Sequence, residues 1–271
     1  MKRILNWVRS GGLRYWAMPV LWVLAVTIIA VIAFRGCNSH DSTMESAPLM
    51  SVGHNQPLDS ISYEGFKVLY NSAWHLPACV AYELTGEHTD GPAPRYDDFW
   101  RDSTVSACPD ADAFKGSGYD RGHMMPASDA KWNATIMRNT FRMTNICPQD
   151  HSLNEGAWQK LEEKVREWAR RDGALIVLAG PVVTNDNTSQ IGDDHVRVPH
   201  AFYKVVLAPQ CTPVRAIAFI FPNQPCHGHL DDYATTIDKI ESLTGLDFFA
   251  ALPDDVENRI EAKCNLNPWI K

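Results

Sequence analysis

Two stretches of the sequence decide how this chain folds: GYDRGHMMPASDAKW, residues 118–132, and TFRMTNICPQDHSLNEGAWQKLEEKVREWARR, residues 140–171. In the second stretch, large apolar residues recur every three or four positions, which is the period of an amphipathic helix. These residues are Trp158, Leu161, Val165 and Trp168. The spacing predicts a helix over Asn154–Arg171, with its apolar stripe facing the interior of the domain.

Short segments rich in β-branched and aromatic residues, bounded by Gly, Pro, Asn or Asp, predict strands on both sides of this helix. They are Phe66–Tyr70, Cys79–Leu84, Tyr119–His123, Thr140–Asn145, Leu175–Val183, Phe202–Leu207 and Val214–Phe221. A second helix is predicted over Asp231–Leu243, with Gly245 as its C-terminal stop. Strands and helices that do not alternate regularly are typical of an α+β fold with a mostly antiparallel sheet.

The N-terminal part contains Tyr15–Phe34, a run of 20 residues without a charge. A helix of about 20 apolar residues crosses a hydrocarbon core of about 30 Å. The run lacks the short apolar core and the small-residue cleavage site of a signal peptide, so we expect an uncleaved transmembrane helix through residues 15–34. Four basic residues precede the run and only Arg35 follows it closely, which places the N-terminus in the cytoplasm and exports the rest.

The expected compartment of the exported part depends on the source: the periplasm or cell exterior for a bacterium, the mitochondrial intermembrane space for a eukaryote. Lipid attachment at Cys37 is the alternative to a membrane helix, although Phe34-Arg35-Gly36 departs from the usual lead-in of apolar and small residues. Residues 36–60 are polar, contain Pro and Gly and lack periodicity, which predicts a flexible tether. Residues 61–271 then form one domain, long enough for a sizeable core.

Six cysteines follow Cys37, in the part expected outside the cytoplasm, where disulfides are permitted. They are Cys79, Cys108, Cys147, Cys211, Cys226 and Cys264. The sequence alone does not choose among the many pairings that six cysteines allow. We favour Cys79–Cys108 and disfavour Cys211–Cys226, because a strand between the latter two would carry their ends far apart.

The charge balance limits how a nucleic acid would be bound. The chain has 25 basic and 32 acidic residues; because the first 35 residues hold five of the basic and none of the acidic ones, the net charge of −7 becomes −12 for the remainder. A protein that neutralises phosphates over a broad surface is basic. A nucleic-acid site here must therefore combine a local basic patch with a metal. The basic residues of the main helix are Lys160, Lys164, Arg166, Arg170 and Arg171.

Several residues in the two stretches indicate chemistry, but each has a structural alternative. Asn154 stands in the apolar stripe at the helix start, where it is either an N-cap or, through its carbonyl oxygen, a ligand for Mg²⁺. His123 is either a structural residue or a general base, because a pKa of about 6.5 suits proton transfer at neutral pH. Arg121 is either a phosphate-binding fork or the partner of its acidic neighbour. Glu162 and Arg166 alone would form an ordinary surface pair.

Three motifs follow one another in this region: Asp120-Arg121-Gly122-His123, then Asn145-Ile146-x-Pro148-Gln149, then Leu153-Asn154-x-x-x-Trp158-x-x-Leu161-Glu162. In this combination the chain resembles the DNA/RNA non-specific endonuclease family, which includes secreted bacterial and mitochondrial nucleases. Weaker similarity covers Arg95–Asp102 and Leu243–Phe249. The resemblance extends over most of residues 61–261 and leaves out the anchor and the tether.

The resemblance implies a ββα-metal finger, in which a hairpin supplies a histidine and the following helix supplies a metal ligand. His123 would be the general base that activates a water. Asn154 would be the direct protein ligand of Mg²⁺, for which Mn²⁺ can substitute, and Glu162 would hold water bound to the metal. The ion would stabilise charge on the transition state and on the leaving 3′ oxygen.

The resemblance also implies which residues contact the substrate. Arg95, Arg121 and Arg166 would bind the scissile phosphate, and Asn145 would support the histidine or the nearby backbone. The expected reaction is endonucleolytic hydrolysis of DNA and RNA, which leaves 5′-phosphate and 3′-hydroxyl ends. Members of the family are often homodimers, so a homodimer is an expected assembly.

Two other classes of function are open alternatives. Cys226-His227-Gly228-His229 forms a candidate zinc site of a hydrolase, although its spacing is not that of a common zinc motif. A catalytically inactive nucleic-acid-binding module on the membrane is the second alternative. The presence of His123, Asn154 and Glu162 together argues against it. Lys204, within the apolar strand segment Phe202–Leu207, is expected to point outward to solvent.

Overall fold

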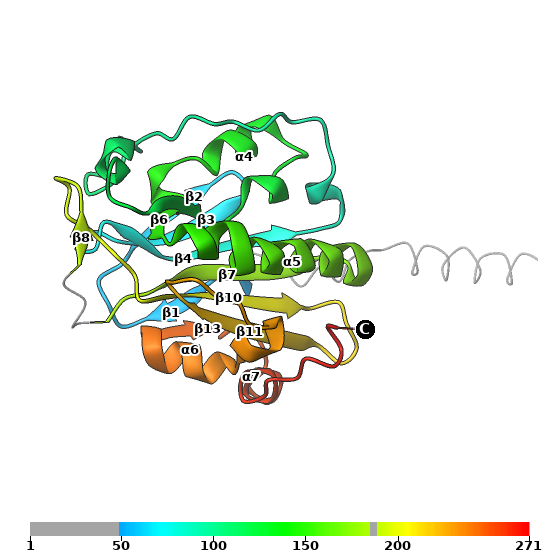
Figure 1. Cartoon of the computed structure of the whole chain (residues 1–271). Coiled ribbons are helices and arrows are strands. Elements are labelled where there is room, and N and C mark those ends of the chain that lie inside the picture. The colour runs from blue at the N-terminus through cyan, green and yellow to red at the C-terminus, as the bar shows by residue number, and fades with distance from the viewer. Residues whose placement is uncertain (1–48, 185–188, 271) are drawn as a thin grey trace, which may run out of the picture. The chain divides into compact units, whose positions relative to one another are not determined.

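The computed structural model describes residues 49–184 and 189–270 (Figure 1). The predicted transmembrane run Tyr15–Phe34 and residues 36–48 of the predicted tether lie outside these ranges. Within the two ranges, no helix combines the length and the apolar character that a membrane crossing requires.

An antiparallel sheet of seven strands forms the centre of the domain, in the order β12-β11-β10-β7-β4-β3-β2. Its strands are β2 (Asp59–Tyr63), β3 (Phe66–Asn71), β4 (Leu76–Leu84), β7 (Leu175–Val182), β10 (Ala201–Ala208), β11 (Arg215–Pro222) and β12 (Ala234–Thr235). The predicted α+β class with a mostly antiparallel sheet is confirmed. The predicted strands outside the finger region all fall within this sheet.

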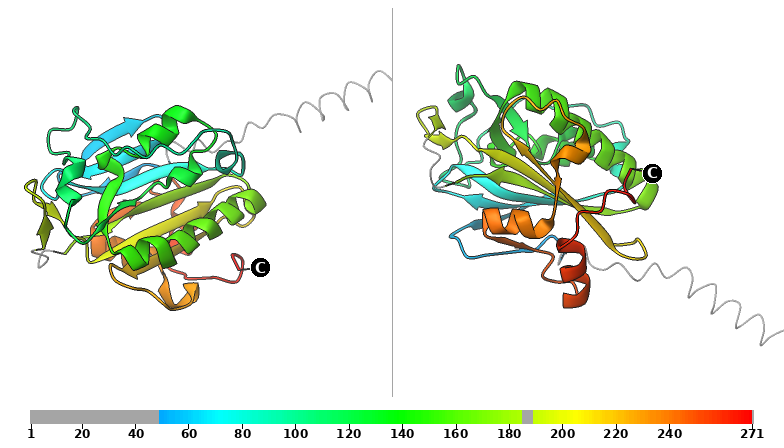
Figure 2. Two further views of the ribbon diagram at one scale, coloured as in Figure 1. Left: turned by 45° about the horizontal axis from the view of Figure 1, so that its top comes forward. Right: turned by 60° about the horizontal axis from the view of Figure 1, so that its bottom comes forward.

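Both faces of the sheet are covered, and each face has its own hydrophobic cluster (Figure 2). One face packs against α5 (Gln159–Asp172). The other packs against α6 (Ile237–Thr244), α7 (Asp254–Glu261) and the small sheet of β1 (Val52–His54) and β13 (Leu246–Phe248). Because the central strands have no solvent-facing side, β7 is buried along its whole length.

The finger region follows the predicted order of strand, strand and helix. β5 (Asp120–His123) pairs in antiparallel register with β6 (Ile146–Gln149), so that His123 lies opposite Ile146. A π-helical turn over Leu153–Trp158 then leads into α5. The remaining short elements are α4 (Ala134–Asn139), β8 (Gln190–Ile191), β9 (Val196–Arg197) and 3-10 turns at Glu87–Thr89, Ala111–Phe114, Ala127–Asp129, Met143–Asn145 and Leu230–Tyr233.

The strand predicted at Thr140–Asn145 is wrong, because the second finger strand begins only at Ile146. Thr140 caps the end of α4, whose start is set by Asn133; the Asn133 side chain accepts hydrogen bonds from two backbone N–H groups of the first turn. Met143–Asn145 forms a 3-10 turn. The apolar and β-branched residues of this segment are buried by packing, which a strand pattern does not distinguish from pairing.

The helix predicted over Asp231–Leu243 begins later, at Ile237, although its stop is confirmed. The Thr236 hydroxyl accepts a hydrogen bond from Lys239 N and caps the helix. The residues before it form a 3-10 turn and then β12, which pairs with the edge of β11. At the other end, Gly245 has φ +69°, the left-handed conformation that glycine tolerates best.

The tether predicted up to Ser60 ends earlier. Val52–His54 pairs with Leu246–Phe248, and β2 starts at Asp59. Backbone pairing with a segment near the opposite end of the chain therefore orders residues whose composition alone suggested a linker. Hydrophobic periodicity does not detect a short edge strand of this kind.

The predicted Cys79–Cys108 disulfide is also wrong. All six cysteines within the described ranges are free thiols. Cys79 belongs to the cluster under α6, whereas Cys108 belongs to the cluster under α5. The sheet therefore lies between the two sulfur atoms. A disulfide requires the Cα atoms of its two cysteines to lie within about 7 Å of each other, so these two cysteines cannot form one.

We expect Trp168→Ala to lower the free energy of unfolding by about 3–5 kcal/mol, because it leaves a cavity under α5. Trp168 is 2% exposed and its ring lies 6.2 Å from that of Phe219 and 4.9 Å from that of Trp269. Denaturant unfolding of the two proteins measures the difference. Trp132→Ala is the matched control: Trp132 is 43% exposed, and its loss should cost less than about 1 kcal/mol. Equal losses in both variants would contradict the packing of α5.

Candidate active site

The end of the finger hairpin and the head of the main helix open into one cavity of about 440 Å³. Its lining includes all the residues predicted to act on substrate or metal: Arg95, Arg121, His123, Asn154, Glu162 and Arg166. Phe99, Asp120, Ser128, Glu155 and Gln159 complete much of the wall. Residues that are up to 71 positions apart in the sequence therefore share a space large enough for a phosphate group.

His123 lines this cavity, and one of its two ring nitrogens is buried. Its ring packs against Phe99 at 5.4 Å and Phe141 at 4.9 Å between ring centroids. Nε2 is buried and makes no hydrogen bond with any described residue. Burial and the positive charge of Arg95 lower the pKa of His123 to about 3, so the imidazole is neutral at neutral pH. A neutral imidazole with a free nitrogen is able to accept a proton.

Gly122 explains how the hairpin brings this histidine into place. A Cβ atom at position 122 would lie 2.2 Å from Gln149 Oε1 and 2.6 Å from Gln149 Cβ. Any side chain there would push β5 away from β6. The glycine of the Asp-Arg-Gly-His motif is therefore required for close strand pairing, and the pairing fixes the position of His123.

Asn145 lies outside the cavity wall and is fully buried. Its Oδ1 accepts from Met125 N at 2.9 Å, and its Nδ2 donates to Met125 O at 2.9 Å and to Thr140 O at 2.8 Å. Its backbone carbonyl also accepts from Met124 N. Asn145 thus holds the two residues that follow His123, a contact of the kind that the resemblance implied, and its side chain faces backbone groups instead of the cavity.

Asn154 is not an N-cap. The cap position is Ser152, and Asn154 lies in the π turn with no capping hydrogen bond of its own. Its Nδ2 donates to Asp120 Oδ2 at 2.9 Å, and the same oxygen lies 2.9 Å from His151 Nδ1. Because the amide nitrogen is tied to the hairpin, the Asn154 carbonyl oxygen is the group left for a ligand. π turns occur frequently at functional sites.

Glu162 and Arg166 do not form the surface pair expected from their spacing. Arg166 Nη1 lies 3.0 Å from Asp129 Oδ1, and Lys204 Nζ lies 3.5 Å from Glu162 Oε1. Tyr82 donates a hydrogen bond to the other Asp129 oxygen at 3.0 Å. Burial raises the pKa of Glu162 to about 7 and lowers that of Lys204, while the attraction between their charges opposes both shifts.

The expectation that Lys204 points to solvent is wrong, since its side chain is 0% exposed. Its ammonium lies 4.4 Å from the centroid of the Trp158 ring, under the helix that carries Glu162. Lys204, Asp129 and Tyr82 were not predicted to belong to the site. For Lys204 the sequence did contain a signal. A lysine within an apolar strand that is covered on both faces cannot reach water, so it needs an acidic partner inside the protein.

Arg95 and Arg121 differ in how tightly they are held. The Arg95 side chain is 58% exposed and pairs with Asp97 at 2.9 Å. Arg121 donates through Nε and Nη2 to Ala111 O at 3.2 and 2.8 Å, and its guanidinium lies 5.2 Å from the Phe99 ring centroid. Arg121 is therefore fixed in place, whereas Arg95 is able to move toward a bound anion.

Comparison with known proteins agrees with this geometry. The family model described as DNA/RNA non-specific endonuclease matches residues 45–255. The chain belongs to this family. Residues 45–255 thus form an endonuclease domain, and the family resemblance deduced from the three motifs is confirmed.

Named relatives include mitochondrial nuclease EXOG of Mus musculus, which is 32% identical over 208 residues, or 70% of this chain and 56% of that protein. A nuclease of Nostoc sp. is 30% identical over 211 residues, covering 73% of this chain and 76% of that one. Mitochondrial endonuclease G of Homo sapiens is 31% identical over 203 residues, covering 69% and 68%. The chain spans little more than half of the mouse EXOG length and 65% of the human one.

A solved structure of the complex of EndoG with EndoGI, described as showing the mechanism of EndoG inhibition, shares the fold. The superposition has a TM-score of 0.66 at 24% identity and covers 72% of this chain and 86% of that chain.

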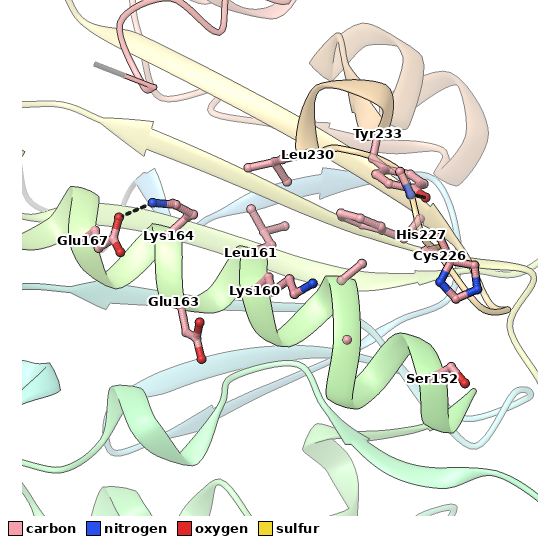
Figure 3. Close-up of a pocket in the computed structure, with 14 residues that line it drawn as sticks. Ser152, Lys160, Leu161, Glu163, Lys164, Glu167, Cys226, His227, Leu230 and Tyr233 are labelled. Atoms are coloured by element: carbon pink, nitrogen blue, oxygen red, sulfur yellow. Dashed lines mark hydrogen bonds and ion pairs between the residues drawn. The ribbon is translucent and has the colours of Figure 1, made fainter.

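A second cavity of about 460 Å³ lies on the other side of the main helix, against the loop that holds the zinc candidate (Figure 3). Figure 3 shows Cys226, His227 and Tyr233 on one side of this cavity and Lys160 of α5 on the other. Cys226 Sγ lies 3.3 Å from the backbone oxygen of Gln224. Among the described residues, the groups of His, Cys, Asp or Glu close enough to share a metal contain neither Cys226 nor the two histidines. The predicted zinc alternative has no structural support.

We expect Lys204→Met to lower the free energy of unfolding by about 3–5 kcal/mol at pH 8, because it leaves Glu162 as an unpaired buried charge. The loss should be smaller at pH 5. Glu162 has a folded pKa above its ordinary 4.5, so the folded state binds a proton that the unfolded state releases, and stability falls as pH rises from 4.5 through the folded pKa. Without Lys204 that pKa rises further. Denaturant unfolding at both pH values measures the change.

Lys164→Met is the matched control for this experiment. Lys164 forms an exposed pair with Glu167 on the same helix, with 52% of its side chain accessible. Its removal should cost less than about 1 kcal/mol at either pH. A pH-independent loss in Lys204→Met would contradict the pairing with Glu162.

Proposed function

We propose that this domain hydrolyses phosphodiester bonds in both DNA and RNA, with little dependence on base sequence. The observation that carries the proposal is the shared cavity in which the neutral imidazole of His123, the Asn154 amide and three arginines meet. A base, a cation ligand and phosphate-binding groups are what a phosphodiester requires. Family membership supports the same reaction class.

In the proposed reaction, the imidazole of His123 takes a proton from a water molecule as the water oxygen attacks phosphorus. The bond from phosphorus to the 3′ oxygen breaks, and that oxygen takes up a proton from solvent. The products carry a 5′-phosphate and a 3′-hydroxyl. The low pKa of His123 keeps its nitrogen unprotonated before each attack, while Phe99 and Phe141 hold the ring in place.

The donor set fits Mg²⁺. The Asn154 carbonyl oxygen would be the direct ligand, because its amide nitrogen is committed to Asp120. Glu162, whose carboxylate is held by Lys204 at the cavity wall, would accept hydrogen bonds from metal-bound water. Hard oxygen donors with several retained waters are the habit of Mg²⁺ in proteins. When bound, the ion supplies positive charge for the charge that develops on the phosphate oxygens and the leaving oxygen; we expect Mn²⁺ to substitute for it.

The arginines would hold the scissile phosphate. Arg166 is fixed by Asp129 and Arg121 by the Ala111 carbonyl, so both guanidinium groups are oriented before substrate arrives. Arg95 would close on the phosphate from its more mobile position. Binding through a few placed arginines and a metal explains how a domain of net negative charge engages a polyanion.

Two further predictions concern the whole chain. Anchoring through residues 15–34, with the catalytic domain outside the cytoplasm, is proposed from the sequence, as is a homodimer. Some relatives are named mitochondrial nucleases, which for a eukaryotic source would favour the intermembrane space.

The central prediction is that plasmid DNA and RNA are both degraded with Mg²⁺, that a chelator stops the degradation, and that His123→Ala reduces the rate by about 10²–10⁴-fold. Gel analysis over time measures the rates, and end-labelling measures the terminal phosphates. His54→Ala is the control and should retain full activity, because His54 is exposed and does not line the cavity. Intact nucleic acid under every condition would exclude the proposed function.

We expect Asp120→Ala to raise the Mg²⁺ concentration for half-maximal activity by about 10–100-fold, because the Asn154 amide loses the partner that orients it. Asp120→Asn keeps an acceptor oxygen and should recover part of the affinity. A thermal unfolding midpoint close to that of the unmodified protein separates this effect from misfolding. If Asp120→Ala lowers the maximal rate without changing the Mg²⁺ dependence, Asp120 does not orient the ligand.

A further inference from the structure

A group of three carboxylates lies on the sheet face opposite the catalytic cavity. Asp238 and Glu241 come from α6 and Glu261 from the end of α7, and one oxygen of each lies within 4.8 Å of the others. The two helices pack side by side below the sheet (Figure 1). We call these three residues the α6–α7 acidic group.

Glu261 is the member that an ordinary acidic surface does not explain. It is 7% exposed, and its Oε1 is buried with no hydrogen-bond partner. The charged groups that act on it most strongly are all acidic: Glu241, Glu257, Asp238 and Asp247. A buried carboxylate without a counter-charge destabilises the folded protein, because the charge is removed from water without compensation.

Buried acids elsewhere in this domain are paired. Asp129 is bound by Arg166, and Asp172 is bound by Arg171 and Arg215. The α6–α7 acidic group differs because no ion pair within the described ranges joins any of its members to a basic side chain. The negative charge of this group is therefore neutralised from solution, by a proton or by a bound cation.

The three carboxylates are placed as ligands of one ion would be. Glu241 Oε1 accepts a hydrogen bond from Phe248 N at 2.7 Å, which fixes the carboxylate and leaves its second oxygen. Glu261 closes the inner side of the group, whereas Asp238 is exposed and opens it to water. A cation held there would have protein oxygens on one side and waters on the other.

We propose that Asp238, Glu241 and Glu261 bind one Ca²⁺ ion that ties α6 to α7. Ca²⁺ takes about 6–8 oxygen ligands, including bidentate carboxylates, in flexible geometry. Mg²⁺ usually keeps most of its waters and uses only one or two carboxylates, and Zn²⁺ favours nitrogen and sulfur ligands. The site would be structural, because the sheet separates it from the catalytic cavity.

The competing explanation is a protonated Glu261. Without a cation, burial and the surrounding carboxylates raise the pKa of Glu261 to about 8, so its carboxyl holds a proton at neutral pH. A proton and a calcium ion are two ways of neutralising the same group. They differ in whether the stability of the protein depends on calcium.

The test uses the full chain carrying Asn154→Ala, which removes the proposed Mg²⁺ ligand and leaves the α6–α7 acidic group intact. Calorimetric titration with CaCl₂ should show one site per chain. At about 100 times the dissociation constant, the thermal midpoint should rise by about 5 °C or more, and MgCl₂ at the same concentration should give a smaller rise. Adding Glu261→Gln should weaken calcium binding by about tenfold or more.

Two further variants keep the test decisive. Asp238→Asn changes an exposed ligand without disturbing the core, and it should also weaken calcium binding. Glu163→Gln, at an exposed acid of α5, is the control and should leave calcium binding unchanged. Absence of calcium binding, or calcium binding by the Glu261→Gln and Asp238→Asn variants that is as tight as that of the parent Asn154→Ala chain, would overturn the proposal in favour of a protonated carboxyl. Nuclease activity of the unmodified chain is tested separately through His123, so the two proposals fail independently.

Discussion

The structure depends on one constraint: the central sheet is covered on both faces. Every side chain of its middle strands enters a core, so a charge there must find a partner inside the protein. Lys204 meets this requirement through Glu162 and the Trp158 ring. Helix α5 is consequently joined to the sheet by apolar packing and also by a buried ion pair that ends at the cavity wall. The orientation of Glu162 is thus a property of the sheet as much as of its own helix.

The finger adds a second level of control through short polar contacts. The Asn154 amide is tied to Asp120, Trp158 Nε1 donates to the His123 carbonyl at 3.4 Å, and Asn145 holds the backbone beyond it. These contacts hold the hairpin and the helix head together. The proposed reaction would benefit from this arrangement, because the side chains of the proposed base and metal ligand lose their freedom during folding and not during the reaction.

The two faces of the sheet handle negative charge in opposite ways. On the finger face, acids are compensated by arginines and a lysine, and the remaining arginines line a cavity for phosphate. On the other face, acids gather without basic partners around Glu261. The net negative charge of the domain is thus unevenly distributed. In the proposed function, local arginines would hold the substrate at one phosphate, whereas the acidic face requires a proton or a cation from solution.

The sequence by itself determined the α+β class, the main helix, most strands of the large sheet and the membership of the cavity. Helical and strand periods indicate which face of an element is buried, and the three motifs carry the resemblance to a family with a hairpin and a helix at this site. The tertiary structure alone decided the partners. Lys204 looked like an outward strand residue. Considered alone, Glu162 and Arg166 fitted an ordinary surface pair, and Asn154 fitted a cap as well as a metal ligand. Each of these four residues instead binds, or is oriented by, a residue from a distant segment. Contacts between distant segments also place Cys79 and Cys108 on opposite faces of the sheet and pair Val52–His54 with Leu246–Phe248. The local sequence pattern predicts the secondary structure of a segment and its buried face. It does not predict hydrogen bonds and ion pairs between segments that only folding brings together.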